Sequence, residues 1–110
     1  MAAALDVKIE KVQHSRLANT TLENIPFGRV FTDHMFECDY ENGTWQTPQI
    51  VPYHALMLDP SAKVFHYGQA IFEGMKAYKD ENDAVWLFRP DENLIRFNKF
   101  SVERKFMKVT

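Results

Sequence analysis

An Asn-Gly pair at positions 42 and 43 restricts the fold of this chain more than any other short motif. Both residue types tolerate positive φ, and a two-residue loop with that backbone joins antiparallel strands. Residues 30–40 before the pair are rich in β-formers, and residues 45–51 follow it up to Pro52. The sequence therefore predicts a β-hairpin. Alternation places the following residues on one face of its first strand: Val30, Thr32, His34, Phe36 and Cys38.

Two more strands are predicted over residues 76–79 and 84–89, joined by a polar turn at residues 80–83. Strands followed by a helix indicate an α+β fold, with a mainly antiparallel sheet and a flanking helix. Residues 1–26 lack a stable period, so they are expected to be an N-terminal extension that lies on something larger. Residues 27–110 are expected to form one small domain.

Two helices are expected in the second half of the chain. Pro60 suits the first position of a short helix that Asp59 would cap. A longer helix is predicted to open at residues 90–93, with acidic residues in its first turn. Its apolar face and its late basic residues are Leu94, Phe97 and Ser101, and Arg104 and Lys105.

Composition excludes several classes of protein. Thirteen Lys and Arg against fifteen Asp and Glu leave a formal net charge of -2, so electrostatic binding of nucleic acid is not expected. Hydrophobic residues make up 45% of the chain, too much for a disordered protein. No signal peptide and no apolar run of membrane-spanning length occur. A single cysteine, Cys38, allows no intramolecular disulfide and fits a reducing compartment. A cytoplasmic location is expected.

Several common catalytic and metal-binding patterns are missing. The glycines form neither a dinucleotide fingerprint nor a phosphate loop. The histidines show no helical i, i+4 pair, so no metal site is predicted. A Ser-His-Asp arrangement stays open, although no nucleophile-elbow motif supports one. Cys38 is expected to be a small buried hydrophobe in a strand rather than a nucleophile.

Aromatic residues and one arginine are the chemically suggestive features. Most of the rings are expected to form a core, but the segment at 65–74 places aromatics between glycines, which can direct rings into a cleft. Arg96 is predicted near the packed face of the long helix, where a guanidinium needs an anionic partner. The alternative is a solvated arginine, and Arg96 by itself favours that alternative.

Four stretches give a specific resemblance. The strings FGRVFTDHM, IVPY, LDPSAKVFHYGQAIFEGMKAYK and LFRPDENLIRFN occur in this order from about Phe27 to Ser101. In residue identity and spacing they closely resemble the N-terminal part of branched-chain amino-acid aminotransferases, which are pyridoxal 5'-phosphate enzymes of fold type IV. The related D-amino-acid aminotransferases and aminodeoxychorismate lyases share only looser versions. The resemblance implies the small N-terminal domain of such an enzyme.

The resemblance also implies roles for four residues. Phe27 and Phe72 would line the pocket for the aliphatic side chain of the substrate. Tyr67 would reach across a homodimer into the pocket of the neighbouring subunit. Arg96 would bind the phosphate of pyridoxal 5'-phosphate. The chemistry of these residues agrees, since rings shape an apolar slot and a guanidinium fork suits a phosphate. The implied reaction moves the amino group of leucine, isoleucine or valine to 2-oxoglutarate, so the small-molecule partners are branched-chain amino acids and 2-oxo acids.

Length is where the chain departs from that family. Family members are several times longer, and their larger cofactor-binding domain carries the Schiff-base lysine, so no catalytic residue is assigned here. Lys76 does not occupy the Schiff-base position and is expected to face solvent. The isolated chain is expected to be inactive, and leucine–2-oxoglutarate turnover above a heat-killed control would contradict this.

Two functions of other classes stay open. The chain would be a non-catalytic dimerisation or interaction module if it associates without binding the cofactor. It would be a structural fragment with an uncovered apolar face if it aggregates or binds hydrophobic dyes.

Overall fold

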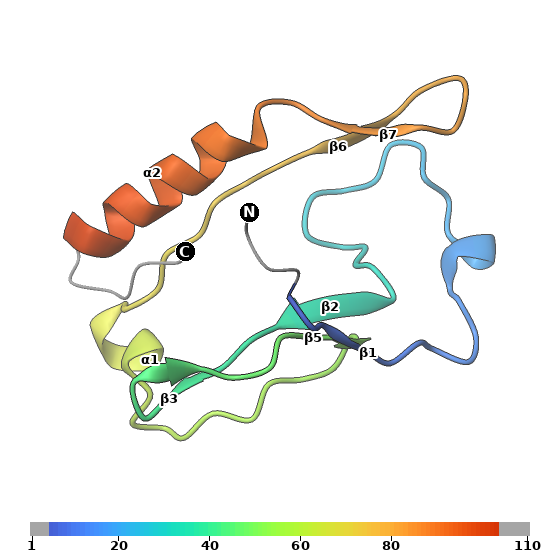
Figure 1. Cartoon of the computed structure of the whole chain (residues 1–110). Coiled ribbons are helices and arrows are strands. Elements are labelled where there is room, and N and C mark those ends of the chain that lie inside the picture. Colours follow the sequence, from blue (N-terminus) through green and yellow to red (C-terminus); the bar gives the residue numbers. More distant parts are fainter. Residues whose placement is uncertain (1–4, 104–110) are drawn as a thin grey trace. The chain divides into compact units, whose positions relative to one another are not determined.

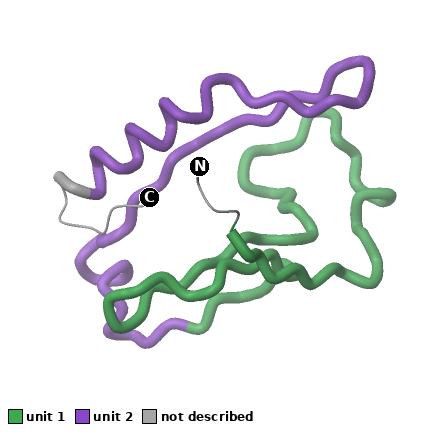
Figure 2. The backbone as a smooth tube through the Cα atoms, viewed as in Figure 1, with its two compact units in different colours: residues 1–57 green, residues 58–110 purple. Residues whose placement is uncertain are grey.

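The computed structural model describes residues 5–103, which contain short strands and helices in mixed order (Figure 1). Contacts divide the chain into two units, Met1–Met57 and Leu58–Thr110 (Figure 2). The elements of the first unit are β1 (Lys8–Ile9), the 3-10 helix η1 (Leu17–Asn19), β2 (His34–Glu37), β3 (Tyr40–Glu41), β4 (Thr44–Trp45) and β5 (Gln49–Pro52). Those of the second are α1 (Lys63–Tyr67), β6 (Ala77–Lys79), β7 (Val85–Leu87) and α2 (Pro90–Glu103).

The predicted turn at Asn42 and Gly43 is confirmed. These residues have φ angles of 51° and 81°, and they join β3 to β4 with Tyr40 opposite Trp45. The two rings meet edge to face with their centroids 5.0 Å apart, a favourable geometry for an aromatic pair. The backbone preference of the turn and the cross-strand ring contact therefore both favour this hairpin.

The prediction of two long hairpin strands is wrong. Residues 30–40 are divided into β2 and β3, and residues 45–51 into β4 and β5. β5 pairs antiparallel with β2, Phe36 opposite Ile50, and parallel with β1. Pro48 precedes β5 and has no N–H to continue a ladder. The predicted common face of residues 30–38 does not form either, because three of its five residues lie outside β2.

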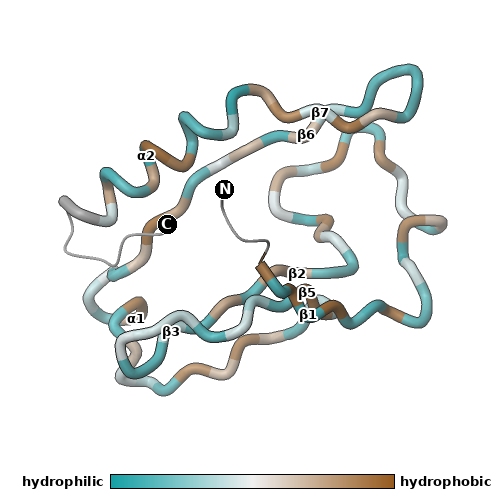
Figure 3. Tube along the Cα trace, in the orientation of Figure 1, coloured by the Kyte–Doolittle hydropathy of each residue, from teal (hydrophilic) through white to brown (hydrophobic). Residues whose placement is uncertain are grey.

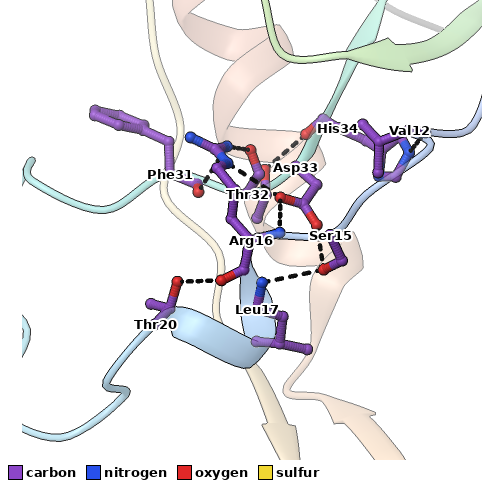
Figure 4. Close-up of polar contacts among 9 residues, drawn as sticks. All are labelled: Val12, Ser15, Arg16, Leu17, Thr20, Phe31, Thr32, Asp33 and His34. Carbon is purple, nitrogen blue, oxygen red and sulfur yellow. Dashed lines mark hydrogen bonds and ion pairs between the residues drawn. The ribbon is translucent and has the colours of Figure 1, made fainter.

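The N-terminal segment is attached to the first unit by polar contacts (Figure 4). The carboxylate of Asp33 accepts hydrogen bonds from the Ser15 hydroxyl at 2.6 Å and from the backbone N–H of Arg16 at 3.1 Å. Arg16 Nη2 donates to the carbonyl of Thr32 at 2.7 Å, and His34 Nε2 accepts from Val12 N–H at 3.0 Å. Together with β1, these contacts place the segment in the same unit as residues 27–57, and the domain boundary at residue 26 stays a prediction.

The short helix begins later than predicted. The Asp59 carboxylate accepts hydrogen bonds from the backbone N–H and the hydroxyl of Ser61, at 2.9 and 2.7 Å. It therefore stabilises a turn, closed by Ala62 N–H donating to the Asp59 carbonyl at 2.8 Å, and α1 starts only at Lys63. Gly68 ends α1 in the left-handed region at φ 58°, the usual role of glycine after a helix.

The second predicted hairpin is confirmed. β6 and β7 pair antiparallel, with Tyr78 opposite Trp86. The turn between them is organised by Asp80, whose carboxylate accepts hydrogen bonds from Ala84 N–H at 3.0 Å and from the Trp86 indole at 2.7 Å. These bonds, that from Trp86 above all, lower the pKa of Asp80.

The long helix is also confirmed, with Pro90 as its first residue. Ser101 is buried and donates a hydrogen bond to the Phe97 carbonyl, whereas Leu94 is exposed. The predicted packed face is therefore realised only in part. Arg104 and Lys105 lie outside the described residues.

The expected aromatic core is not present in the part of the chain that the structure describes. No hydrophobic side chain there is buried, and hydrophobic residues are spread along both units (Figure 3). The strands form three small sheets rather than one, and the main contacts between elements are those of strand pairing. A core needs two packed layers, which neither unit builds from its described elements. The mixed α and β content and the mainly antiparallel pairing agree with the predicted α+β class.

Candidate functional site

A pocket of about 680 Å³ lies in the second unit, between the end of α1 and the middle of α2. Residues 67–74 line one part of it, and Arg96 and Phe100 of α2 line the other. Gly68 turns the chain at the end of α1, so the segment after it runs without regular structure as far as β6. The glycine-bracketed stretch that the sequence singled out therefore forms a wall of this pocket.

Three of the four predicted site residues meet at this pocket. Tyr67 is the last residue of α1, Phe72 lies in the irregular segment, and Arg96 projects from α2. Both rings are largely exposed, so they are accessible to a ligand. Phe27 belongs to the first unit and is fully exposed, so its role in the substrate pocket stays a prediction.

Arg96 is held by Glu73 in a two-pronged ion pair. Arg96 Nε donates to Glu73 Oε2 at 2.6 Å, and Arg96 Nη2 donates to Glu73 Oε1. The side chain of Glu73 is only 12% exposed, whereas that of Arg96 is 62% exposed. Bidentate pairs of this kind fix the plane of the guanidinium as well as its position. Arg96 therefore has the anionic partner that was considered, while most of its side chain is still in contact with solvent.

Asn93, one turn before Arg96 on α2, completes the arrangement. Its side-chain amide donates to Glu73 Oε1 at 3.0 Å and to the Gly74 carbonyl at 2.8 Å. The Gly74 N–H also donates to Glu73 Oε1, at 3.1 Å. We call Glu73, Asn93 and Arg96 the clamp. It ties α2 to the segment before β6.

The two charged members of the clamp, Glu73 and Arg96, are both ionised over the whole physiological pH range. Hydrogen bonds from Arg96 and then from Asn93 lower the pKa of Glu73 from 4.5 to about 2. The same carboxylate raises the pKa of Arg96 further above its already high value. Arg96 Nη1 has no hydrogen-bond partner among the described residues. The exposed edge of the guanidinium therefore has N–H groups that suit an anion.

Sequence reasoning did not find Glu73 and Asn93. It expected either an anionic partner for Arg96 or none, and the partner is 23 residues away in the chain. No helical or strand spacing connects positions that far apart. The only signal was a carboxylate placed directly between Phe72 and Gly74, in a segment already marked as unusual.

The remaining candidates lie away from this pocket. Lys76 is exposed, as expected, and is not among the residues that line the pocket. Cys38 is half-buried between β2 and β3, and its thiol donates to the Gln46 carbonyl at 3.2 Å, so the expectation of a buried strand residue is wrong. Within the described residues no group of three His, Cys, Asp or Glu side chains could hold a metal ion.

His54 forms one more ion pair in the first unit. Its Nε2 lies 3.3 Å from Glu37 Oε2. The contact of its ring with the Ala55 carbonyl, and then the charge of Glu37, raise the pKa of His54. Both side chains are partly exposed, so this pair is a feature of the surface.

No described helix is both long enough and apolar enough to cross a lipid bilayer.

Known proteins share much of this sequence, although no family model matches it. Branched-chain-amino-acid transaminase 1 of Bacillus subtilis (strain 168) is 55% identical over 85 residues, which are 76% of this chain and 24% of that protein. The cytosolic branched-chain-amino-acid aminotransferase of Saccharomyces cerevisiae is 48% identical over 98 residues, 87% of this chain and 26% of that protein. The enzyme of Dictyostelium discoideum is 46% identical over 91 residues. The chain spans about a quarter of the length of these curated relatives.

Proposed function

We propose that this protein, which over its matched residues belongs to the branched-chain-amino-acid aminotransferase family, transfers the amino group of leucine, isoleucine or valine to 2-oxoglutarate with pyridoxal 5'-phosphate. The observation that carries the proposal is the meeting of Tyr67, Phe72 and Arg96 at one pocket. An apolar wall and a cation are what a substrate with an aliphatic side chain and a phosphorylated cofactor need. The chain would supply the small N-terminal domain of a fold type IV enzyme.

Arg96 suits the phosphate of the cofactor. Glu73 occupies one edge of its guanidinium, and the other edge is exposed at the pocket. Arginine binds phosphate through parallel N–H···O bonds from such an edge. When bound, pyridoxal 5'-phosphate supplies the electron sink for the reacting carbon, and Arg96 would anchor it by its phosphate.

Tyr67 and Phe72 would select the substrate by shape. Their rings are exposed where they line the pocket, and an apolar wall favours an aliphatic side chain over a polar one. One methylene changes the discrimination by only about 1–3 kcal/mol. The protein should therefore accept both valine and leucine. Phe27 would line the pocket for the aliphatic side chain of the substrate. In a cytoplasmic homodimer, Tyr67 would reach into the pocket of the neighbouring subunit.

The role of Arg96 is tested by cofactor retention. We expect full-length protein carrying Arg96→Ala to lose pyridoxal 5'-phosphate on dialysis far faster than the wild type, because its phosphate loses a charged donor. The matched control is Arg89→Ala, since Arg89 pairs with Glu92 and does not line the pocket. Equal retention by the Arg96 variant and the wild type would show that Arg96 is only a surface residue.

A non-catalytic dimerisation module is the second candidate, and the exposure of Tyr67 and Phe72 favours it. Exposed rings are frequent at protein interfaces. Sedimentation that depends on protein concentration, in protein that binds no pyridoxal 5'-phosphate, would support this candidate over the transaminase.

A further inference from the structure

We propose that Glu73 and Asn93 are positioning residues that hold the Arg96 guanidinium in the orientation in which it binds a phosphate group. This inference rests on the proposed function, because it concerns how the same arginine meets the cofactor. It goes further in assigning to two residues a task that they would carry out through Arg96.

The first support is the part of Arg96 that Glu73 occupies. A guanidinium has five N–H groups, and Glu73 accepts from Nε and from one N–H of Nη2. This side-on contact leaves the edge formed by Nη1 and the second N–H of Nη2. Arg96 lines the pocket and its side chain is 62% exposed, so this edge is the one that would meet an anion there. Glu73 therefore determines which edge of Arg96 remains for an anion.

The second support is the way in which Glu73 is itself held. Its Oε1 accepts from the Asn93 amide at 3.0 Å and from the Gly74 N–H at 3.1 Å. The Asn93 amide also binds the Gly74 carbonyl. Asn93 and Arg96 are three residues apart on α2, so they lie on the same helix face and reach the same segment. Asn93 thus fixes the carboxylate that fixes Arg96.

The third support is energetic. A free arginine loses its rotamer freedom when it binds an anion, and this cost weakens binding. In the clamp, the side chain is ordered before any anion arrives. The Glu73 carboxylate also repels a phosphate, but the guanidinium with which it forms the ion pair offsets its charge. Ordering should therefore outweigh repulsion, and loss of Glu73 or Asn93 should weaken phosphate binding.

The experiment compares pyridoxamine 5'-phosphate with pyridoxamine, two probes that differ only in the phosphate and carry no aldehyde to bond covalently. Calorimetric titration into the full-length protein gives both dissociation constants. We expect Glu73→Gln and Asn93→Ala each to weaken the phosphorylated probe by about 2- to 10-fold and to leave pyridoxamine unchanged. The matched control, Glu92→Gln, should change neither constant, because Glu92 lies on α2 outside the clamp.

A double variant tests whether Glu73 acts through Arg96. In an Arg96→Ala background, Glu73→Gln should cause no further loss for pyridoxamine 5'-phosphate. An equal loss for both probes would show a general structural role, and unchanged or tighter binding of the phosphorylated probe would also overturn the inference. Wild-type protein that binds both probes equally would instead contradict the proposed phosphate role of Arg96, and the inference would fall with it.

Discussion

At the scale of single residues, the Glu73–Arg96 pair differs from the other ion pairs of the second unit. Lys79–Asp83 and Arg89–Glu92 are formed by side chains that are all 60% or more exposed. Such pairs contribute little to stability. Glu73 is only 12% exposed and accepts further hydrogen bonds from Asn93 and Gly74. The ionised state of Glu73 is therefore stabilised by hydrogen bonds of the folded chain, whereas the charged groups of the other two pairs are hydrated by solvent.

We expect the ionisation of Glu73 to be visible in acid. Its pKa is lowered from 4.5 to about 2, so the folded state binds the proton less tightly than the unfolded state. The contribution of the ionised pair to stability is thus fully present above pH 4.5 and is lost as the pH falls toward 2. An NMR titration that follows the Glu73 carboxyl carbon should give a midpoint near 2.

A site-resolved measurement is needed because the pKa values of Asp33, Asp59 and Asp80 are also lowered. A bulk unfolding curve would combine all four carboxylates. Removal of the clamp partner by Arg96→Ala should move the Glu73 midpoint upward, and a wild-type midpoint near 4.5 would contradict the clamp.

At the scale of elements, short-range contacts of side chains and backbone decide where strands and helices begin and end. Asp80 closes the β6–β7 turn, and Gly68 ends α1. Asp59 shows the opposite outcome, because its carboxylate binds Ser61 and stabilises a turn in place of the predicted helix start. Each of these contacts spans six residues or fewer, yet two local structures can compete for one carboxylate.

The Asn42-Gly43 turn offers a test of backbone strain alone. Gly43 has a φ of 81°, and an added Cβ would meet no atom within 4 Å. Gly43→Ala should therefore weaken the β3–β4 hairpin by about 1–2 kcal/mol, through the cost of the left-handed region and not through a clash. The measurement is the temperature dependence of the proton NOE between Tyr40 and Trp45.

Gly74→Ala is the matched control, because Gly74 does not have a positive φ and an added Cβ there also meets nothing within 4 Å. It should leave the hairpin NOE unchanged. The strain argument would be refuted if Gly43→Ala preserved the NOE to the same temperature as the wild type.

At the scale of the whole molecule, the dominant property is the lack of a buried hydrophobic side chain among the described residues. Phe27, Met57 and Phe72 are almost fully exposed. Exposed apolar surface on this scale indicates an interaction site or an aggregation liability. Neither unit therefore covers its apolar side chains with its own described elements.

We expect the 110-residue chain on its own to bind 1-anilinonaphthalene-8-sulfonate. Its fluorescence should be several-fold higher than that of a compact globular protein of equal mass, because apolar surface is open to the dye. Phe72→Ser should lower the signal, whereas Glu81→Ser, at an exposed polar position, should not. Fluorescence no higher than that of the compact reference would show that the apolar side chains are covered in the isolated chain.

The sequence by itself determined the features whose interactions are local. The Asn42-Gly43 turn, the hairpin of β6 and β7 and the start of α2 at Pro90 were predictable because their backbone preferences lie within a few residues. The same reasoning failed for the two long strands at residues 30–40 and 45–51, because β2 and β1 both pair with β5 and Pro48 separates β4 from β5. The resemblance to aminotransferases was likewise readable, since it depends on residue order alone.

Only the tertiary structure decided how the candidate site is built. Glu73 and Arg96 are 23 residues apart, and Ser15 and Asp33 are 18 apart. Contacts over such distances depend on how loops and helices approach one another, and no periodicity in the sequence records that approach. From the sequence it could be predicted that Arg96 needs an anionic partner. Which carboxylate it met, and which edge of the guanidinium remained exposed, followed from the placement of α2 against the segment before β6.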